Sequence, residues 1–148
     1  KALNEVQLQL MEMYSEVFLI GVGATDSKGV YGTIEGLSQK FGANRVIEGP
    51  IAEQMLTGFC IGASLAGSRP ILIHHRIDFI LLSLDQIINH AAKYPYMFGG
   101  QQKIPMVISA VLKRLNTSQR RWQNALIVKT KTISCSAIST SKTPSTRR

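Results

Sequence analysis

The chain has 148 residues, of which 45% are hydrophobic and 18% are charged. A chain of this length and composition can bury a core, which excludes a wholly disordered protein or a fibre. The apolar runs are too short to cross a bilayer and none resembles a signal peptide, so we expect no membrane partner. Because the chain starts at Lys1 rather than Met, we expect its true N-terminus to be missing.

The net charge of +8 is unevenly distributed along the chain. Residues 1–109 carry 8 Lys/Arg and 9 Asp/Glu, for a net charge of −1, whereas residues 110–148 carry 9 Lys/Arg and no acid. This pattern predicts one folded domain over residues 1–109 and a basic, irregular tail over residues 110–148. Nucleic-acid binding would concern the tail alone and would be non-specific, so we keep it only as an alternative function.

The predicted elements alternate between strands and helices. Four short apolar runs predict strands, at residues 17–22, 45–47, 70–73 and 104–108. Helical spacing of apolar residues predicts helices, at residues 2–13, 34–41, 55–66 and 80–91. In the third helix, one face carries Met55, Leu56, Phe59, Cys60 and Ala63. In the fourth, the apolar stripe is Ile80, Leu81, Leu84, Ile87, Ile88 and Ala91, opposite Asp85, Asn89 and Lys93.

This order predicts an α/β fold, a mostly parallel sheet with helices on both faces. Ligands of such sheets bind beyond the carboxyl ends of the strands, so the loops that follow Ile20, Ile47 and Ile73 are the informative ones. Gly21 and Gly23 do not complete a phosphate-binding fingerprint, which excludes a nucleotide-binding loop. The two cysteines lack the spacing of metal ligands, so we expect no metal site. Cys60 lies in an apolar run, so we expect its thiol to be buried. Unpaired cysteines are typical of a reducing compartment, so we expect a cytoplasmic location.

Several segments together resemble a known family. The segments are GPIAE at residues 49–53, TGFCIGASLAGSRPI at residues 57–71, and shorter matches at residues 17–21, 41–46, 85–93 and 96–100. From about residue 2 to residue 108, the chain resembles the transketolase-like pyrimidine-binding domain of thiamine-diphosphate enzymes. Within that family it is most similar to beta subunits of the first component of 2-oxoacid (pyruvate-type) dehydrogenases.

The resemblance implies a role for three residues at the thiamine pyrimidine ring. Glu53 matches the family's glutamate, which drives tautomerisation of the aminopyrimidine, while the cofactor itself performs the difficult chemistry. Ile51 matches a contact beside the ring, and Phe79 matches an aromatic that stacks on it. The residues alone also allow Glu53 to be a first-turn helix carboxylate and Phe79 to be a core aromatic. A helix N-terminus favours the carboxylate of Glu53, whereas proton sharing requires burial, which we expect Ile51 and Phe79 to provide.

Two histidines follow the predicted strand 70–73, where a site loop should lie. His74 and His75 are candidates for acid–base work or for binding a substrate carboxylate. A polar surface turn explains them equally well. Similar family members have a His-x-Arg-x-Asp-Phe run here, which this chain matches with His74, Arg76, Asp78 and Phe79.

The resemblance also implies partners. The family binds the cofactor diphosphate and its magnesium through a Gly-Asp-Gly and Asn pattern on another domain, and this pattern is absent here. We therefore expect an alpha-type partner chain that holds the diphosphate and magnesium, a second copy of this chain, and a 2-oxoacid substrate. The chain also looks truncated, and the acid-free sequence from Ala110 suggests a change of reading frame. A non-catalytic remnant is consequently the other alternative.

Overall fold

The computed structural model describes residues 2–27 and 29–111, and the statements below concern these residues. The chain divides into two units, residues 1–113 and 114–148, and all described residues belong to the first. The helices of this unit are α1 (Ala2–Met13), η1 (Val30–Gly32), α2 (Leu37–Phe41), α3 (Glu53–Leu65), η2 (Ile77–Ser83), η3 (Gln86–Ala91) and α4 (Tyr94–Met97). Its strands are β1 (Val17–Gly21), β2 (Val46–Glu48), β3 (Arg69–His74) and β4 (Val107–Ala110).

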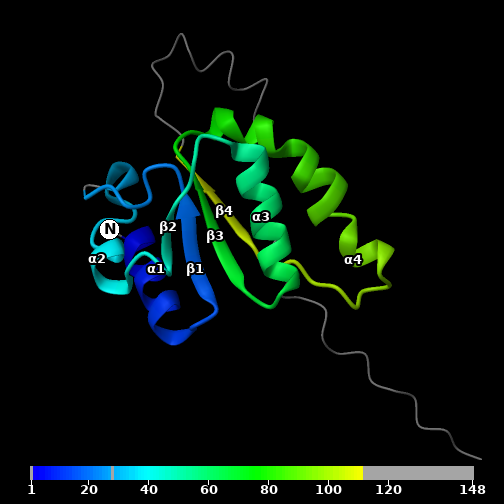
Figure 1. Ribbon diagram of the computed structural model, residues 1–148, viewed down its shortest axis with the longest axis horizontal. Helices are drawn as coiled ribbons and strands as arrows, with labels where there is room; N and C mark the ends of the chain where they lie inside the picture. The colour runs from blue at the N-terminus through cyan, green and yellow to red at the C-terminus, as the bar shows by residue number, and fades with distance from the viewer. Residues whose placement is uncertain (1, 28, 112–148) are drawn as a thin grey trace, which may run out of the picture. The chain divides into compact units, whose positions relative to one another are not determined.

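The four strands form one sheet in the order β2-β1-β3-β4, and every neighbouring pair is parallel (Figure 1). Gly21 on β1 pairs with Glu48 on β2 and with Ile73 on β3, so these strands end at a common edge. The parallel sheet confirms the predicted α/β class. It also gathers the loops after the first three strands at one end of the sheet, where ligands of such folds bind.

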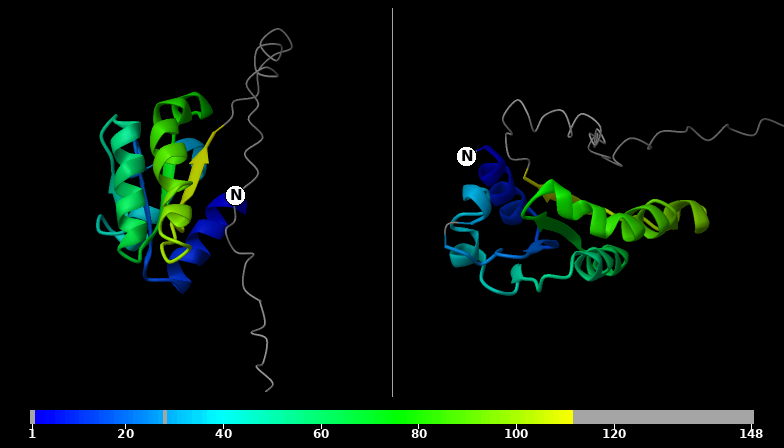
Figure 2. Two further views of the ribbon diagram at one scale, coloured as in Figure 1. Left: turned by 90° about the vertical axis from the view of Figure 1, so that its right-hand side faces the viewer. Right: turned by 90° about the horizontal axis from the view of Figure 1, so that it is seen from above.

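Helices cover both faces of the sheet, as predicted. Alternation along the strands sends Leu19 and Ile71 to the face that α1 and α2 cover, and Ile20 and Leu72 to the face that α3 covers. Figure 2 shows α1 and α3 on opposite sides of the strands. The core therefore has two layers of side chains, one on each side of the sheet.

Helix α3 confirms the third predicted helix, but its apolar stripe is only partly buried. Leu56 and Cys60 are 2% and 0% exposed and pack on the sheet, whereas Met55 and Phe59 are 50% and 49% exposed. The inward face of α3 instead includes polar residues such as Thr57. The helices η2 and η3 pack beside α3, so a buried hydroxyl on this face can find a hydrogen-bond partner. Burial raises the pKa of the Cys60 thiol to about 12, in agreement with the buried thiol predicted.

The fourth predicted helix is not a regular α-helix. Residues 77–83 form the 3₁₀ helix η2 and residues 86–91 form the π-helix η3, so the apolar residues do not keep a 3.6-residue period. The expected stripe is consequently wrong: Leu81 and Ile88 are more than half exposed, and Ser83 is the buried residue. On the opposite side, Asp85, Asn89 and Lys93 form the i,i+4 ladder that their spacing suggests, with hydrogen bonds of 2.8 and 2.7 Å.

The last strand, β4, begins three residues later than predicted and continues through Ala110. Ala110 pairs with His74, and the backbone N–H of Ile77 donates to the carbonyl of Val111 at 3.1 Å. The predicted basic tail lies outside the described residues from position 112 onward. Across the described part of the chain, no helix has the length and apolar character needed to cross a membrane.

Candidate functional site

The candidate site lies at the edge of the sheet where β1, β2 and β3 end. The chain is closely packed here: a Cβ atom on Gly21 would lie 2.4 Å from the carbonyl oxygen of Ile73. The N–H of Gly49 donates to the carbonyl of Gly21 at 3.0 Å, which ties the end of β2 to the end of β1. Glycine at position 21 therefore lets three strand ends meet, and the functional side chains sit on the residues that follow.

Glu53 is the first residue of α3 and comes five residues after Glu48, the last residue of β2. The Glu53 side chain is buried, with 8% of its surface exposed. The N-terminus of α3 has no side-chain cap, because Ala52 occupies the N-cap position. The partial positive charge of a helix N-terminus stabilises a carboxylate at this position. Ile51, expected to bury Glu53, is 83% exposed and does not cover it in this structure.

His74 ends β3 and is 3% exposed. Burial lowers the pKa of its ring, the nearby Glu53 carboxylate opposes that shift, and His75 adds to it. The Glu53 carboxylate is thus near enough to His74 to act on its charge, although the two residues come from different elements. With its pKa below the ordinary value, the ring is neutral at pH 7 and can both donate and accept a hydrogen bond.

A buried hydroxyl network connects these two residues, and the sequence did not reveal it. Thr57 Oγ1 lies 2.7 Å from the backbone carbonyl of Glu53 and 2.8 Å from Ser83 Oγ. Ser83 Oγ lies 3.2 Å from the same carbonyl and 3.3 Å from His74 Nε2. The sequence signal for this network was the presence of two polar residues, Thr57 and Ser83, within the apolar patterns of the third and fourth predicted helices. Ser83 could not be assigned to the buried side without knowing that the fourth helix is irregular.

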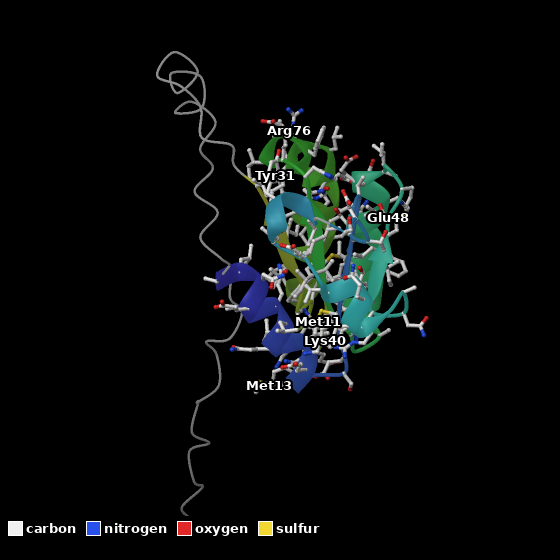
Figure 3. All side chains as sticks on the ribbon, turned by 90° about the vertical axis from the view of Figure 1, so that its left-hand side faces the viewer. Met11, Met13, Tyr31, Lys40, Glu48 and Arg76 are labelled. Atoms are coloured by element: carbon white, nitrogen blue, oxygen red, sulfur yellow. The ribbon has the colours of Figure 1, made fainter. Side chains whose placement is uncertain are left out.

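Glu48 is a second site residue that the sequence analysis missed. Its carboxylate accepts hydrogen bonds from Gly23 N (2.6 Å), Thr25 N (3.0 Å) and Thr25 Oγ1 (2.9 Å), and so holds the loop after β1. Burial raises the pKa of Glu48, but the hydrogen bonds from Thr25, Gly23 and Ala24 together outweigh that effect and lower it. Figure 3 shows Glu48 at the same end of the molecule as Arg76, away from Met11, Met13 and Lys40. The signal in the sequence was an acid directly after an apolar strand.

The remaining predicted residues lie around this edge. A Cβ atom on Gly23 would be 2.9 Å from Cε1 of His75, so the loop that Glu48 holds lies directly against the partly buried His75 ring. Phe79, on η2, is also partly buried, and the guanidinium of Arg76 lies 5.2 Å from the centre of its ring. Arg76 in turn is within 3.8 Å of Asp78. His75 and Phe79 therefore occupy the same strand-end region as His74.

An open hollow of about 550 Å³ adjoins Glu53 between α3 and the two irregular helices. It is lined by Ala52, Glu53, Gln54, Met55, Gly58, Leu82 and Gln86. The lining includes neither Ile51 nor Phe79, so the structure does not gather all the residues predicted for the pyrimidine ring around one cavity. In the described residues, no group of three or more His, Cys, Asp and Glu side chains is arranged to hold a metal ion.

The fold and the site define a parallel α/β domain with a buried acid at the carboxyl edge of its sheet. Residues 1–112 match the protein family described as "Transketolase, pyrimidine binding domain". The match covers most of the chain, so the chain belongs to this family, as the resemblance implied.

Comparison with known proteins finds similarity to beta subunits of the pyruvate dehydrogenase E1 component. The chain is 39% identical over 107 residues to the pyruvate dehydrogenase E1 component subunit beta of Rhizobium meliloti (strain 1021). It is 38% identical over 107 residues to the mitochondrial subunit of Saccharomyces cerevisiae (strain ATCC 204508 / S288c), and 39% identical over 106 residues to that of Homo sapiens. Each match covers 72% of this chain but only 23%, 29% and 30% of these relatives, respectively. The chain thus spans less than a third of their length.

Proposed function

We propose that this chain forms the pyrimidine-binding half of a thiamine-diphosphate-dependent enzyme that acts on a 2-oxoacid. The observation that carries the proposal is the placement of Glu53, a buried acid on the first turn of α3, whose backbone carbonyl is linked to the buried His74 through Ser83. Family membership and the similarity to pyruvate dehydrogenase beta subunits support it. Thiamine diphosphate, when bound, would supply carbanion chemistry at the substrate carbonyl.

Glu53 fits the pyrimidine end of this cofactor. A carboxyl group with little access to water can hold a proton against a ring nitrogen, because burial weakens competition from solvent. The hydroxyl network uses only the backbone carbonyl of Glu53, so the carboxyl group stays available for the ring. Phe79 would stack on the ring and Ile51 would contact it, and the exposure of Ile51 is consistent with a side chain that a ligand covers.

His74 and His75 are the proposed candidates for proton transfer and for the substrate carboxylate. Their positions differ in a way that divides these roles. His75 is partly exposed and can reach a ligand directly, whereas His74 is almost fully buried. We therefore assign direct contact with the substrate to His75.

An alpha-type chain would hold the diphosphate and its magnesium. The hollow beside Glu53 is open, and two large apolar residues of its lining are exposed, Met55 (50%) and Leu82 (56%). Ile51, which precedes the lining residue Ala52 in the chain, is also exposed (83%). Exposed apolar surface of this kind marks a protein interface. A second copy of this chain would complete the assembly.

Reconstitution tests the proposal. The full chain is mixed with the diphosphate-binding chain that we expect the neighbouring reading frame to encode, together with thiamine diphosphate and Mg²⁺. Cofactor affinity is measured by calorimetry, and decarboxylation is measured with pyruvate and with longer 2-oxoacids. We expect Glu53→Gln to lower the decarboxylation rate by about 100-fold or more, the usual contribution of general acid–base catalysis.

Glu35→Gln serves as the matched control, because Glu35 is an exposed acid on a loop between η1 and α2. This control should keep the wild-type rate and affinity. Unchanged decarboxylation by Glu53→Gln would refute the assignment of Glu53. If the wild-type chain binds no cofactor in any mixture, the catalytic function is refuted and the chain is a non-catalytic remnant.

A further inference from the structure

Three polar side chains from three different elements meet in the interior beneath Glu53. Thr57 on α3 and Ser83 on η2 are each 0% exposed, and His74 on β3 is 3% exposed. Their contacts run from His74 Nε2 to Ser83 Oγ (3.3 Å), from Ser83 Oγ to Thr57 Oγ1 (2.8 Å), and from Thr57 Oγ1 to the Glu53 carbonyl (2.7 Å). Polar groups this deeply buried are costly unless each one is hydrogen-bonded, so the three depend on one another.

The number of protons fixes the direction of each hydrogen bond. Each hydroxyl has one proton, and the carbonyl of Glu53 has none, so Thr57 donates in the shortest contact. Thr57 also directs this proton toward Ser83 Oγ at 2.8 Å, and Ser83 directs its own proton to the carbonyl of Glu53 at 3.2 Å. Nothing remains on Ser83 to donate to the imidazole, and His74 must therefore carry its proton on Nε2 and donate it to Ser83 Oγ.

The network ends at the first residue of α3. Ala52 cannot cap this helix with its side chain, so the usual side-chain anchor of a helix N-terminus is missing. Thr57 and Ser83 do not replace that cap, which would accept hydrogen bonds from backbone N–H groups, but both hydroxyls donate to the carbonyl of Glu53, at 2.7 and 3.2 Å. This carbonyl belongs to the residue that carries the candidate acid, so a shift of the network would also shift the carboxyl group.

We propose that Thr57 and Ser83 are positioning residues, held in register by the Nε2–H of His74, which fix the orientation of Glu53 toward the pyrimidine ring. The inference rests on the proposed function for its target, whereas its geometry belongs to this chain alone. It also gives His74 a role distinct from proton transfer to substrate. The ring anchors the network from the end of β3, facing the two other titratable groups nearby, Glu53 and His75.

The tautomer of His74 is the first test, and it needs no cofactor. The full chain is labelled with ¹⁵N-histidine, and long-range ¹H–¹⁵N spectra are recorded at pH 7, with signals assigned through His75→Gln and His90→Gln. We expect the Nε2–H tautomer for His74 in the wild-type chain, and a mixture of tautomers in Ser83→Ala. A wild-type Nδ1–H tautomer, or a spectrum that Ser83→Ala leaves unchanged, would overturn the proposal.

The second test compares two substitutions of one residue in the reconstituted complex. Thr57→Val keeps the shape of the side chain and removes the hydroxyl, whereas Thr57→Ser keeps the hydroxyl. We expect Thr57→Val to lower kcat by about 10-fold or more while the KM for the 2-oxoacid stays within twofold, because a misplaced group slows chemistry. Thr57→Ser should restore most of the rate, and urea unfolding confirms that both variants fold.

The outcomes separate this inference from the proposed function. If Glu53→Gln abolishes activity and Thr57→Val matches Thr57→Ser, the positioning role is refuted and the proposed function stands. If Glu53→Gln has no effect, the proposed function fails and the positioning role fails with it. A rate loss that is equal in Thr57→Val and Thr57→Ser would show a packing effect, which also overturns the positioning role.

Discussion

The carboxylate of Glu48 accepts the backbone N–H of Gly23 at 2.6 Å, a contact between residues that are 25 positions apart in the sequence. Glu48 is the last residue of β2 and Gly23 lies in the loop after β1, so their hydrogen bond closes that loop over the end of β2. Because Gly23 lies against the ring of His75, the same contact supports one wall of the candidate site. Glu48 therefore connects the stability of a loop to the shape of the site.

Substitution of Glu48 tests this connection. Glu48→Gln keeps the shape of the side chain but removes its charge, and charge-assisted hydrogen bonds are the stronger ones. We expect the free energy of unfolding to fall by about 1 kcal/mol, a small value because the site is solvent-exposed. Urea unfolding at pH 7 measures the change, with Glu35→Gln as control. An equal loss in the control would refute the special role of Glu48.

The same carboxylate predicts a dependence on acid. The pKa of Glu48 in the folded chain is below its ordinary value of 4.5, so the unfolded chain binds the proton more readily. Glu48 thus contributes stability above pH 4.5, and this contribution is lost as the pH falls through the folded pKa. The difference between wild type and Glu48→Gln in urea unfolding should shrink as the pH is lowered from 7 to about 3. A constant difference would contradict the prediction.

The Glu53 carboxylate should influence the titration of His74. The Glu53 carboxylate raises the pKa of His74 against the lowering effect of burial, so its removal should leave burial less opposed. We expect Glu53→Gln to move the pKa of His74 further below 6.5. NMR titration of the ¹⁵N-labelled ring in the full chain measures the shift, with His90 as the internal reference. A rise in the pKa of His74 would show that the two groups are not coupled as the structure indicates.

Replacement of glycine by alanine should have opposite effects on stability at Gly21 and at Gly62. At Gly21, a new Cβ atom would lie 2.4 Å from the carbonyl of Ile73, so Gly21→Ala should push β1 and β3 apart and cost about 2–3 kcal/mol. At Gly62, inside α3, a Cβ atom meets nothing within 4 Å. Gly62→Ala should therefore stabilise the helix by about 1 kcal/mol. Thermal unfolding of both variants measures the difference, and destabilisation of similar size in both would contradict the packing described at Gly21.

The sequence alone determined the strands, their parallel arrangement and the family. Strand runs such as residues 17–22 and 70–73 are continuous and apolar, and this pattern is typical of strands buried on both faces. Positions such as Glu53 followed from the resemblance, because the order of short motifs is visible without coordinates. Local patterns and the order of motifs are properties of the chain itself, so they can be read before it folds.

Tertiary structure alone decided how the site is assembled. Residues 80–91 carry a helical apolar pattern, yet Ser83 is buried against α3 and Leu81 is exposed, because the hydrogen bonds of the Ser83 hydroxyl favour its burial over the regular period. The partnership of Glu48 with Gly23 likewise joins segments that are distant in sequence. Hydrogen bonds between elements depend on how parallel strands bring their ends together, and no local pattern encodes that arrangement.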